Sequence, residues 1–376
     1  MLYWIVITIM MIILLFIKSS GYTPVSAFGM ALGAIACKLF QLTAAANAIQ
    51  FKPEQFMYLL LPPIVLCSGL KFKWNRAIKT IGTSMVFAWL GTIGTAGWVG
   101  VGLWSYSNLE PWIVAFWIGS ILSPTDPVGT LDIMKNLQGN EEIRLVLEHE
   151  SLLNDAVAVM LVHMSRHAWE AQKTITKIES MEIFGMALGL ACISCFIGCL
   201  GAWLVQKHQE AALVTVVGMF LFSVSEFLGA SGIISLFVFG ACLSAFGLRE
   251  DIYKTIEYIA DLSEMYVYVT MGSVITMIEW KYSWIGVNVI IACIVGRIIN
   301  VFILGYLVRI GGVTWSMFQL IFMSTCGMRG AVSLALAVYT PEPLKDMFVT
   351  ITVMEVVFSM LYTSITNSFL IKYIDD

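Results

Sequence analysis

Apolar runs long enough to cross a membrane repeat along almost the whole chain. A helix rises about 1.5 Å per residue, so roughly 20 apolar residues span a hydrocarbon layer of about 30 Å. Most of the loops between the runs are short. Thirteen runs can be drawn, at about 2–17, 25–40, 56–70, 80–103, 112–134, 143–164, 183–205, 211–228, 232–247, 257–279, 284–307, 314–338 and 347–370. This pattern predicts an all-α polytopic membrane protein with about 13 transmembrane helices.

The composition argues against a water-soluble domain. Hydrophobic residues make up 59% of the 376 residues and charged residues only 12%, whereas soluble domains carry roughly 25% charged residues. Such a surplus of apolar surface cannot all be buried in one soluble core. The net charge of −4 also argues against a nucleic-acid partner, because nucleic-acid binding depends on basic residues. The expected surroundings are a lipid bilayer.

The basic residues predict an orientation, because cytoplasmic loops carry an excess of Lys and Arg. With the N-terminus outside, twelve of them fall in inside loops, namely Lys18, Lys71, Lys73, Arg76, Lys79, Lys135, Arg144, Lys207, Arg249, Lys254, Arg309 and Lys372. Six fall in outside loops, namely Lys52, Arg166, Lys173, Lys177, Lys281 and Lys345. We therefore predict an outside N-terminus and a cytoplasmic C-terminus. We expect the plasma membrane, with an organellar membrane as the alternative.

Two of the runs contain residues that interrupt a helix. The fifth contains Ser-Pro-Thr-Asp-Pro at 123–127, and each proline lacks an amide donor and disfavours helix in the residue before it. The twelfth contains glycines at 327 and 330, which permit a similar break. Unwound backbone at membrane depth is tolerated where it lines a cavity. Interrupted helices in both halves of a chain point to a transporter built from inverted repeats. We therefore predict two broken, crossing helices.

The sixth run places acidic residues within the membrane. Asp155 lies near the midplane, at a cost of about 2.5–3.5 kcal/mol on insertion scales. Ser151 is four residues before it and shares its helix face, and Asn154 borders that face. Glu150 is five residues before Asp155, about 140° around the helix. We expect Asp155, Ser151 and Asn154 to line one cavity, with Glu150 directed towards another helix.

These residue types suit a small hard cation. A cation such as sodium prefers oxygen ligands, which Asp155, Asp126, the Ser151 hydroxyl and unwound carbonyls near Thr125 can supply. The same carboxylate can instead hold a proton, and a site that accepts either ion is that of an exchanger. Two alternatives stay open. Asp126 could simply cap a helix end beside its prolines, and Asp155 could be a structural hydrogen-bonding partner.

The buried arginines have expected structural roles. Arg297 is predicted to be the counter-ion of Glu150. Arg329 is expected either to pair structurally or to satisfy the broken carbonyls of the twelfth run. No catalytic residue or cofactor is expected. No resident metal is expected either, because metal-ligand spacing is lacking among the four histidines, His149, His163, His167 and His208.

Four motifs then indicate a family. The Glu-x-Glu-Ser-Leu-Leu-Asn-Asp pattern at 148–155 resembles the signature helix of the sodium/proton exchangers in the type-1 branch of the monovalent cation:proton antiporter superfamily. Residues 60–64, 125–128 and 327–334 resemble that family's third-, fifth- and twelfth-span motifs, in the same order over nearly the whole chain. His149 stands where glycine is frequent, and Met328 where leucine is usual. Asn154-Asp155, in place of two aspartates, resembles the electroneutral branch.

The resemblance implies an antiporter, and not an enzyme, that exchanges Na⁺ (or Li⁺) for H⁺ one for one by alternating access, in pH homeostasis. It implies that the ion is surrounded by Asp155, Asp126, Thr125, Ser151 and Asn154, and that Glu150 and Arg297 form a buried pair. It also implies a homodimer, with a transport core at 80–164 and 284–370 and a scaffold at 2–79 and 183–283. K⁺/H⁺ exchange is the alternative.

Two remoter alternatives belong to other classes. One is a passive cation channel, which would conduct without proton coupling. The other is an intramembrane aspartyl protease with Asp126 and Asp155 as its dyad, but its Gly-x-Gly-Asp signature is absent from the sequence.

Overall fold

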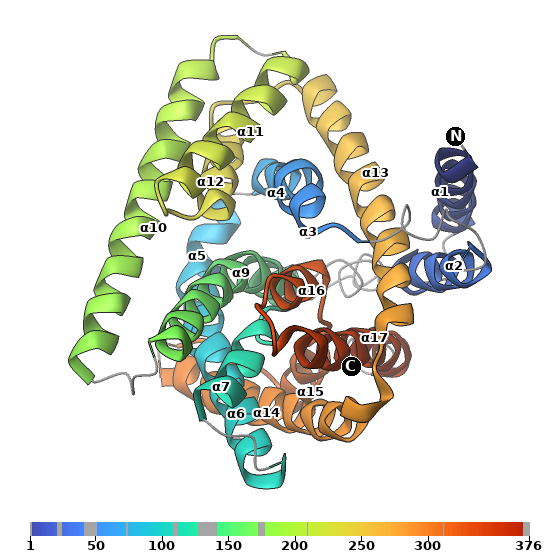
Figure 1. Ribbon diagram of the computed structural model, residues 1–376. Coiled ribbons are helices and arrows are strands. Elements are labelled where there is room, and N and C mark those ends of the chain that lie inside the picture. Colours follow the sequence, from blue (N-terminus) through green and yellow to red (C-terminus); the bar gives the residue numbers. More distant parts are fainter. Residues whose placement is uncertain are drawn as a thin grey trace. The chain divides into compact units, whose positions relative to one another are not determined.

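The computed structural model describes residues 2–20, 25–40, 51–72, 74–107, 112–126, 141–171, 177–208, 210–310 and 312–370. Within these ranges every regular element is helical (Figure 1). In chain order they are α1 (Leu2–Ser20), α2 (Val25–Phe40), α3 (Pro53–Gln55), η2 (Phe56–Leu60), α4 (Leu61–Leu70), α5 (Trp74–Val86), η3 (Phe87–Gly91), α6 (Thr92–Ser107), α7 (Trp112–Ile121), α9 (Glu141–Glu170), α10 (Lys177–Val205), α11 (Ala211–Phe227), α12 (Gly232–Ala245), α13 (Glu250–Val274), η4 (Ile275–Met277), η5 (Trp280–Tyr282), α14 (Ser283–Ile310), α15 (Met317–Thr325), α16 (Ala331–Val338) and α17 (Lys345–Leu370).

Each of the predicted apolar runs coincides with one or more of these helices, so the all-α prediction is confirmed. The part of the fifth run beyond Asp126 lies outside the described residues. Helix ends differ from the predicted limits by several residues at some runs, and at the sixth run α9 extends past both predicted limits of 143 and 164. Two acidic residues in its first turn favour the helix start, and an Arg166–Glu170 ion pair of 2.8 Å supports its last turn.

Three of the described helical stretches are long and apolar enough, by length and composition alone, to cross a membrane. They are Ile78–Ser105, Trp280–Ile310 and Lys345–Thr363. Other apolar helices, such as α11 and α12, are shorter. Helix α9 is long enough, but its middle carries Glu148, Glu150 and Asp155. Two of these charges, Glu150 and Asp155, are among the residues to which the sequence analysis assigns roles.

The chain divides into two compact units. The first comprises residues 1–53, 80–170 and 268–376, and the second comprises 54–79 and 171–267. Both segments expected to form a transport core, 80–164 and 284–370, fall within the first unit. Their functional role stays a prediction. In the second unit, α4, α10, α11 and α12 pack closely, and a side chain at Gly240 of α12 would begin 2.8 Å from the Leu66 carbonyl of α4. Small residues at such crossings let helix backbones approach within a membrane.

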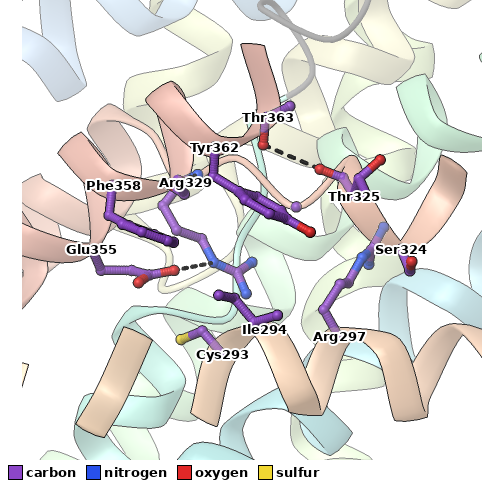
Figure 2. A pocket seen from close by; sticks show the side chains of 12 residues that line it. Cys293, Ile294, Arg297, Ser324, Thr325, Arg329, Glu355, Phe358, Tyr362 and Thr363 are labelled. Atoms are coloured by element: carbon purple, nitrogen blue, oxygen red, sulfur yellow. Dashed lines mark hydrogen bonds and ion pairs between the residues drawn. The ribbon is translucent and has the colours of Figure 1, made fainter. Parts of the chain in front are cut away.

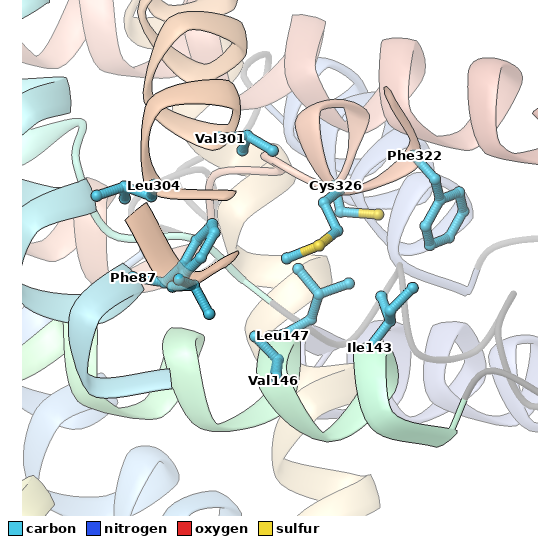
Figure 3. Close-up of a cluster of buried hydrophobic side chains, with 10 residues drawn as sticks. Phe87, Ile143, Val146, Leu147, Val301, Leu304, Phe322 and Cys326 are labelled. Carbon is cyan, nitrogen blue, oxygen red and sulfur yellow. The ribbon is translucent and has the colours of Figure 1, made fainter. Parts of the chain in front are cut away.

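In the first unit, a buried hydrophobic cluster holds the first turns of α9 in place. Ile143, Val146 and Leu147 of α9 pack against side chains of η3, α14 and α15 (Figure 3). These partners are Phe87, Val301, Leu304, Val308, Phe322, Met323 and Cys326. Interlocked side chains of this kind fix a helix against its neighbours. The cluster therefore positions the polar residues that follow it on α9.

Candidate functional site

The fifth run is broken where its sequence predicts. Helix α7 ends at Ile121, and its last bonds run from the Leu122 amide to the Ile118 carbonyl (3.0 Å) and from the Ser123 amide to the Ser120 carbonyl (3.4 Å). Pro124 has no amide hydrogen with which to continue the ladder. Thr125 and Asp126 therefore follow in non-helical backbone, and their own backbone groups must find partners elsewhere.

The twelfth run is broken in the same way, and the two breaks meet. Helix α15 ends at Thr325 and α16 begins at Ala331. Between them, the Met328 carbonyl accepts a hydrogen bond of 2.7 Å from the Asp126 amide. A Cβ at Gly330 would lie 2.6 Å from Asp126 Oδ2, so only glycine lets this carboxylate lie against the start of α16. The positive end of a helix dipole favours an anion there. Asp126 thus lies at a helix end, but that of the other broken helix.

Helix α9 contributes two side chains that donate hydrogen bonds to Thr125. Ser151 Oγ donates a hydrogen bond to the Thr125 carbonyl, and Asn154 Nδ2 donates one of 2.8 Å to Thr125 Oγ1. Both donors are buried, with Asn154 only 1% exposed. Asn154 Oδ1 finds no hydrogen-bond partner within the described part of the chain. A buried acceptor without a partner is costly, so this oxygen is a candidate ion ligand.

Asp155 completes the group and lies half-buried on α9. It is close enough to Asp126 for their charges to interact. The five residues predicted to surround an ion are thus brought together from α9 and the broken fifth run. Two carboxylates that repel each other in a poorly hydrated place are stabilised when a cation or a proton comes between them. The arrangement can exchange one positive ion for another.

Glu150 and Arg297 form a separate ion pair. Arg297 of α14 donates hydrogen bonds to Glu150 from both terminal nitrogens. Nη1 donates to Oε1, and Nη2 donates to Oε2 at 3.1 Å. The exposed fractions of Arg297 and Glu150 are 5% and 2%. Arg297 Nη2 also lies 3.4 Å from the Met323 carbonyl of α15. The pair joins three helices and leaves Glu150 outside the group around Thr125.

Arg329 has two roles predicted from the sequence, structural pairing or satisfying the carbonyls of its own broken run. The carbonyls that it contacts belong to the fifth run: its Nη1 donates to the carbonyls of Ser123 (3.0 Å) and Pro124 (3.3 Å). The reason is that the end of α7 leaves carbonyls without helical donors, and the crossing brings a guanidinium to them. Arg329 thereby joins the two broken helices.

A further buried acid, Glu355, lies in the middle of α17 and is not among the residues predicted from the sequence. It is 3% exposed, and its Oε1 lies 4.0 Å from Arg329 Nε. The available signal was a single acidic residue within the apolar run 347–370, the same signal that identified Asp155.

As for metals, no group of three or more His, Cys, Asp or Glu side chains that could hold an ion occurs among the described residues.

Comparisons with known proteins show what the chain is similar to. The family model described as "Sodium/hydrogen exchanger, transmembrane" matches residues 5–373. Sodium/hydrogen exchanger 2 of Oryctolagus cuniculus is 25% identical over 86% of this chain and 43% of its own length. Sodium/hydrogen exchanger 8 of Homo sapiens is 26% identical over 93% of this chain and 66% of its own length. The chain thus spans two thirds or less of these two relatives.

A solved structure shares the fold. The sodium proton antiporter MjNhaP1 from Methanocaldococcus jannaschii, solved at pH 8, superposes with a TM-score of 0.75 over 96% of this chain and 97% of that one. At 19% sequence identity, this likeness concerns the arrangement of the helices.

Proposed function

The chain belongs to the sodium/hydrogen exchanger family, and we propose that it is a secondary antiporter that exchanges Na⁺ (or Li⁺) for H⁺ across a membrane. The observation that carries the proposal is the pair of hydrogen bonds from Ser151 and Asn154 to Thr125, which bring the part of α9 that carries Asp155 to the unwound segment that carries Asp126. Carboxylates from two segments form a site that is stabilised when it binds one positive ion. Sodium and a proton can each supply that charge, so the two ions compete for one site.

In the proposed cycle, the site is never left with both carboxylates unneutralised. Sodium is bound by carboxylate oxygens of Asp155 and Asp126, with Asn154 Oδ1 and oxygens of Thr125 as neutral ligands. Ser151 and Asn154 hold Thr125 in position through the hydrogen bonds they already make. When a proton binds Asp155 instead, the sodium ion leaves. Release and binding on opposite sides of the membrane then couple the two gradients.

The coupling needs a part that moves, and we assign it to the segments that carry the broken helices. Residues 80–164 and 284–370 form the transport core, and residues 2–79 and 183–283 form the scaffold and the contact of a homodimer. The N-terminus lies outside and the C-terminus in the cytoplasm of a cell whose plasma membrane holds the protein. The two breaks give the core an ion site at mid-membrane without a continuous pore, which suits alternating access.

Purified full chain in proteoliposomes tests the proposal. A pH-sensitive dye inside the vesicles reports proton movement after NaCl, LiCl or KCl is added outside. We expect rapid movement of protons with sodium and lithium, and little with potassium. A response to potassium alone would make the protein a potassium/proton exchanger. Sodium flux without proton movement would identify a channel, and neither flux from correctly folded protein would defeat the proposal.

A further inference from the structure

Three polar side chains form a stripe along one face of α17. Glu355, Ser359 and Thr363 are spaced four residues apart, which places them on one side of a helix. All three are buried. Apolar residues could fill a buried helix face, so three polar ones at this spacing call for an explanation. Each of the three contacts the broken twelfth run. We call this set the α17 stripe.

The α17 stripe holds both sides of the break (Figure 2). Thr363 Oγ1 donates to the Thr325 carbonyl at the end of α15, at 3.1 Å. Ser359 Oγ accepts from the Arg329 amide at 3.0 Å. The Glu355 carboxylate faces the Arg329 side chain, with 4.0 Å between Oε1 and Nε. The backbone and the guanidinium of Arg329 are therefore both set by one helix.

The charges around this contact indicate that Glu355 balances the charge of Arg329. A cavity of about 20 Å³ is lined by two arginines, Arg297 and Arg329, and by a single acid, Glu355. Arg297 is already neutralised by Glu150, which is not one of the lining residues. Glu355 is therefore the lining carboxylate available to balance Arg329, and the pair is 1% and 3% exposed. Little water screens charges that are so deeply buried.

Arg329 in turn reaches the candidate ion site. Its guanidinium donates to the carbonyls of Ser123 and Pro124, and the next residue is Thr125. A contact path thus runs from Glu355 through Arg329 to the unwound segment that carries two of the candidate ligands, Thr125 and Asp126. Through this path a charge on α17 can act on a site that it does not touch.

We propose that Glu355 is a positioning residue whose charge sets the affinity of the site for the transported cation. With Glu355 ionised, Arg329 holds the fifth-run carbonyls while its own charge is balanced. Without that balance, the guanidinium repels a cation bound beside Thr125, and in a poorly screened interior one such charge changes affinity on the order of tenfold. The ligands themselves stay in place, so the maximal rate is kept. The inference rests on the proposed sodium/proton exchange.

The test uses full-length protein with two substitutions at this position and one matched control. E355Q removes the charge and keeps the shape, while E355D keeps the charge and draws it back from Arg329. The control D346N makes the same acid-to-amide change at the exposed start of α17. Two quantities are measured for each variant. They are the sodium concentration for half-maximal proton movement in proteoliposomes, and the rise in melting temperature that sodium causes in detergent.

We expect the half-saturating sodium concentration to increase on the order of tenfold in E355Q and less in E355D, with maximal rates near that of the wild type. D346N should match the wild type in both measurements. Unchanged sodium dependence in folded E355Q would overturn the inference, as would a lower maximal rate at unchanged sodium dependence.

Two further results also have a defined meaning, namely a variant that does not fold and a wild type that moves no protons. If E355Q does not fold, E355D must show the weaker sodium dependence, and a wild-type value in E355D would overturn the inference. Failure of both variants to fold would assign Glu355 to folding and overturn it as well. If the wild type is stabilised by sodium but moves no protons, the exchange proposal fails by itself, and the melting shifts of the variants still decide the role of Glu355.

Discussion

Arg297 and Glu150 meet as a two-pronged ion pair although they are 147 residues apart in the chain. Both side chains are almost completely buried. A buried pair of this kind contributes little when intact, because both charges lost their hydration on folding. Removing one partner is different, since it leaves the other charge buried and uncompensated at a cost of about 3–5 kcal/mol.

Arg297→Ala is therefore expected to lower the melting temperature of the purified protein more than Asp155→Asn does. Asp155 is half-buried and its change to the amide removes a repulsion with Asp126, whereas Arg297→Ala strands Glu150. Thermal unfolding in the same detergent, followed by tryptophan fluorescence, compares the two. The double variant R297A/E150A should recover part of the loss. An R297A melting temperature at or above that of D155N would rule out the stabilising role of the pair.

Asp155→Asn is expected to abolish sodium-dependent proton movement while leaving the protein folded. The amide has the same shape as the carboxylate but holds neither a proton nor the full charge that a sodium ion requires. The measurement is dye-reported proton flux in proteoliposomes, after size-exclusion chromatography has shown an intact preparation. The control is Glu170→Gln, which removes a carboxylate at the exposed end of the same helix. Wild-type exchange by folded D155N would remove Asp155 from the mechanism.

Exchange is expected to be electroneutral, because Asn154 adds no second titrating group beside Asp155. One sodium ion then replaces one proton, provided that Asp126 keeps the same ionisation throughout the cycle. Initial rates should be equal at zero and at large membrane potential, set with potassium and valinomycin. A solid-supported membrane should show no sustained sodium-driven current. A current whose sign follows the sodium gradient would contradict one-for-one exchange and make Asp126, which interacts with Asp155, the first candidate for a second proton carrier.

Gly330→Ala is expected to weaken sodium binding and lower the melting temperature. The backbone of Gly330 is extended and suits any residue, so the difficulty is space. The new methyl carbon would lie 2.6 Å from Asp126 Oδ2 and 2.7 Å from Asp126 Cβ, and Asp126 must move away from it. Sodium titrations of proton flux measure the effect.

The matched control for that change is Gly97→Ala in α6, where the added methyl meets nothing within 4 Å. Alanine favours a helix over glycine by up to about 1 kcal/mol, so G97A should retain sodium dependence and be at least as stable as the wild type. Equal sodium dependence in G330A and G97A would show that the close approach of Asp126 to α16 is not needed for binding.

The local features of this fold could be predicted because they depend on short stretches of sequence. Pro124 lacks an amide hydrogen wherever it lies, so α7 had to end near it. The angle between Glu150 and Asp155 follows from the pitch of a helix. The position of Ser151 relative to Asn154 follows from the same geometry, and both residues contact Thr125.

What could not be predicted depends on how distant segments meet. The sequence marks Arg329 as buried but does not say which of the unsatisfied carbonyls it reaches, because only the crossing brings Ser123 and Pro124 to it. Glu355 could have been found, since it is a lone acid in an apolar run. Its partner could not, because the 4.0 Å contact to Arg329 depends on how α17 packs beside α15 and α16.

The bonds from Arg329 to Ser123 and Pro124 also bear on how the chain is made. They join residues 206 and 205 positions apart. At ribosomal rates of about 5–20 residues per second, roughly 10–40 s separate synthesis of the two partners. During that interval the carbonyls of Ser123 and Pro124 have been synthesised without the guanidinium that bonds them in the finished fold. Until the twelfth run is made, these carbonyls must find other hydrogen-bond donors, because an unsatisfied backbone group is costly at membrane depth.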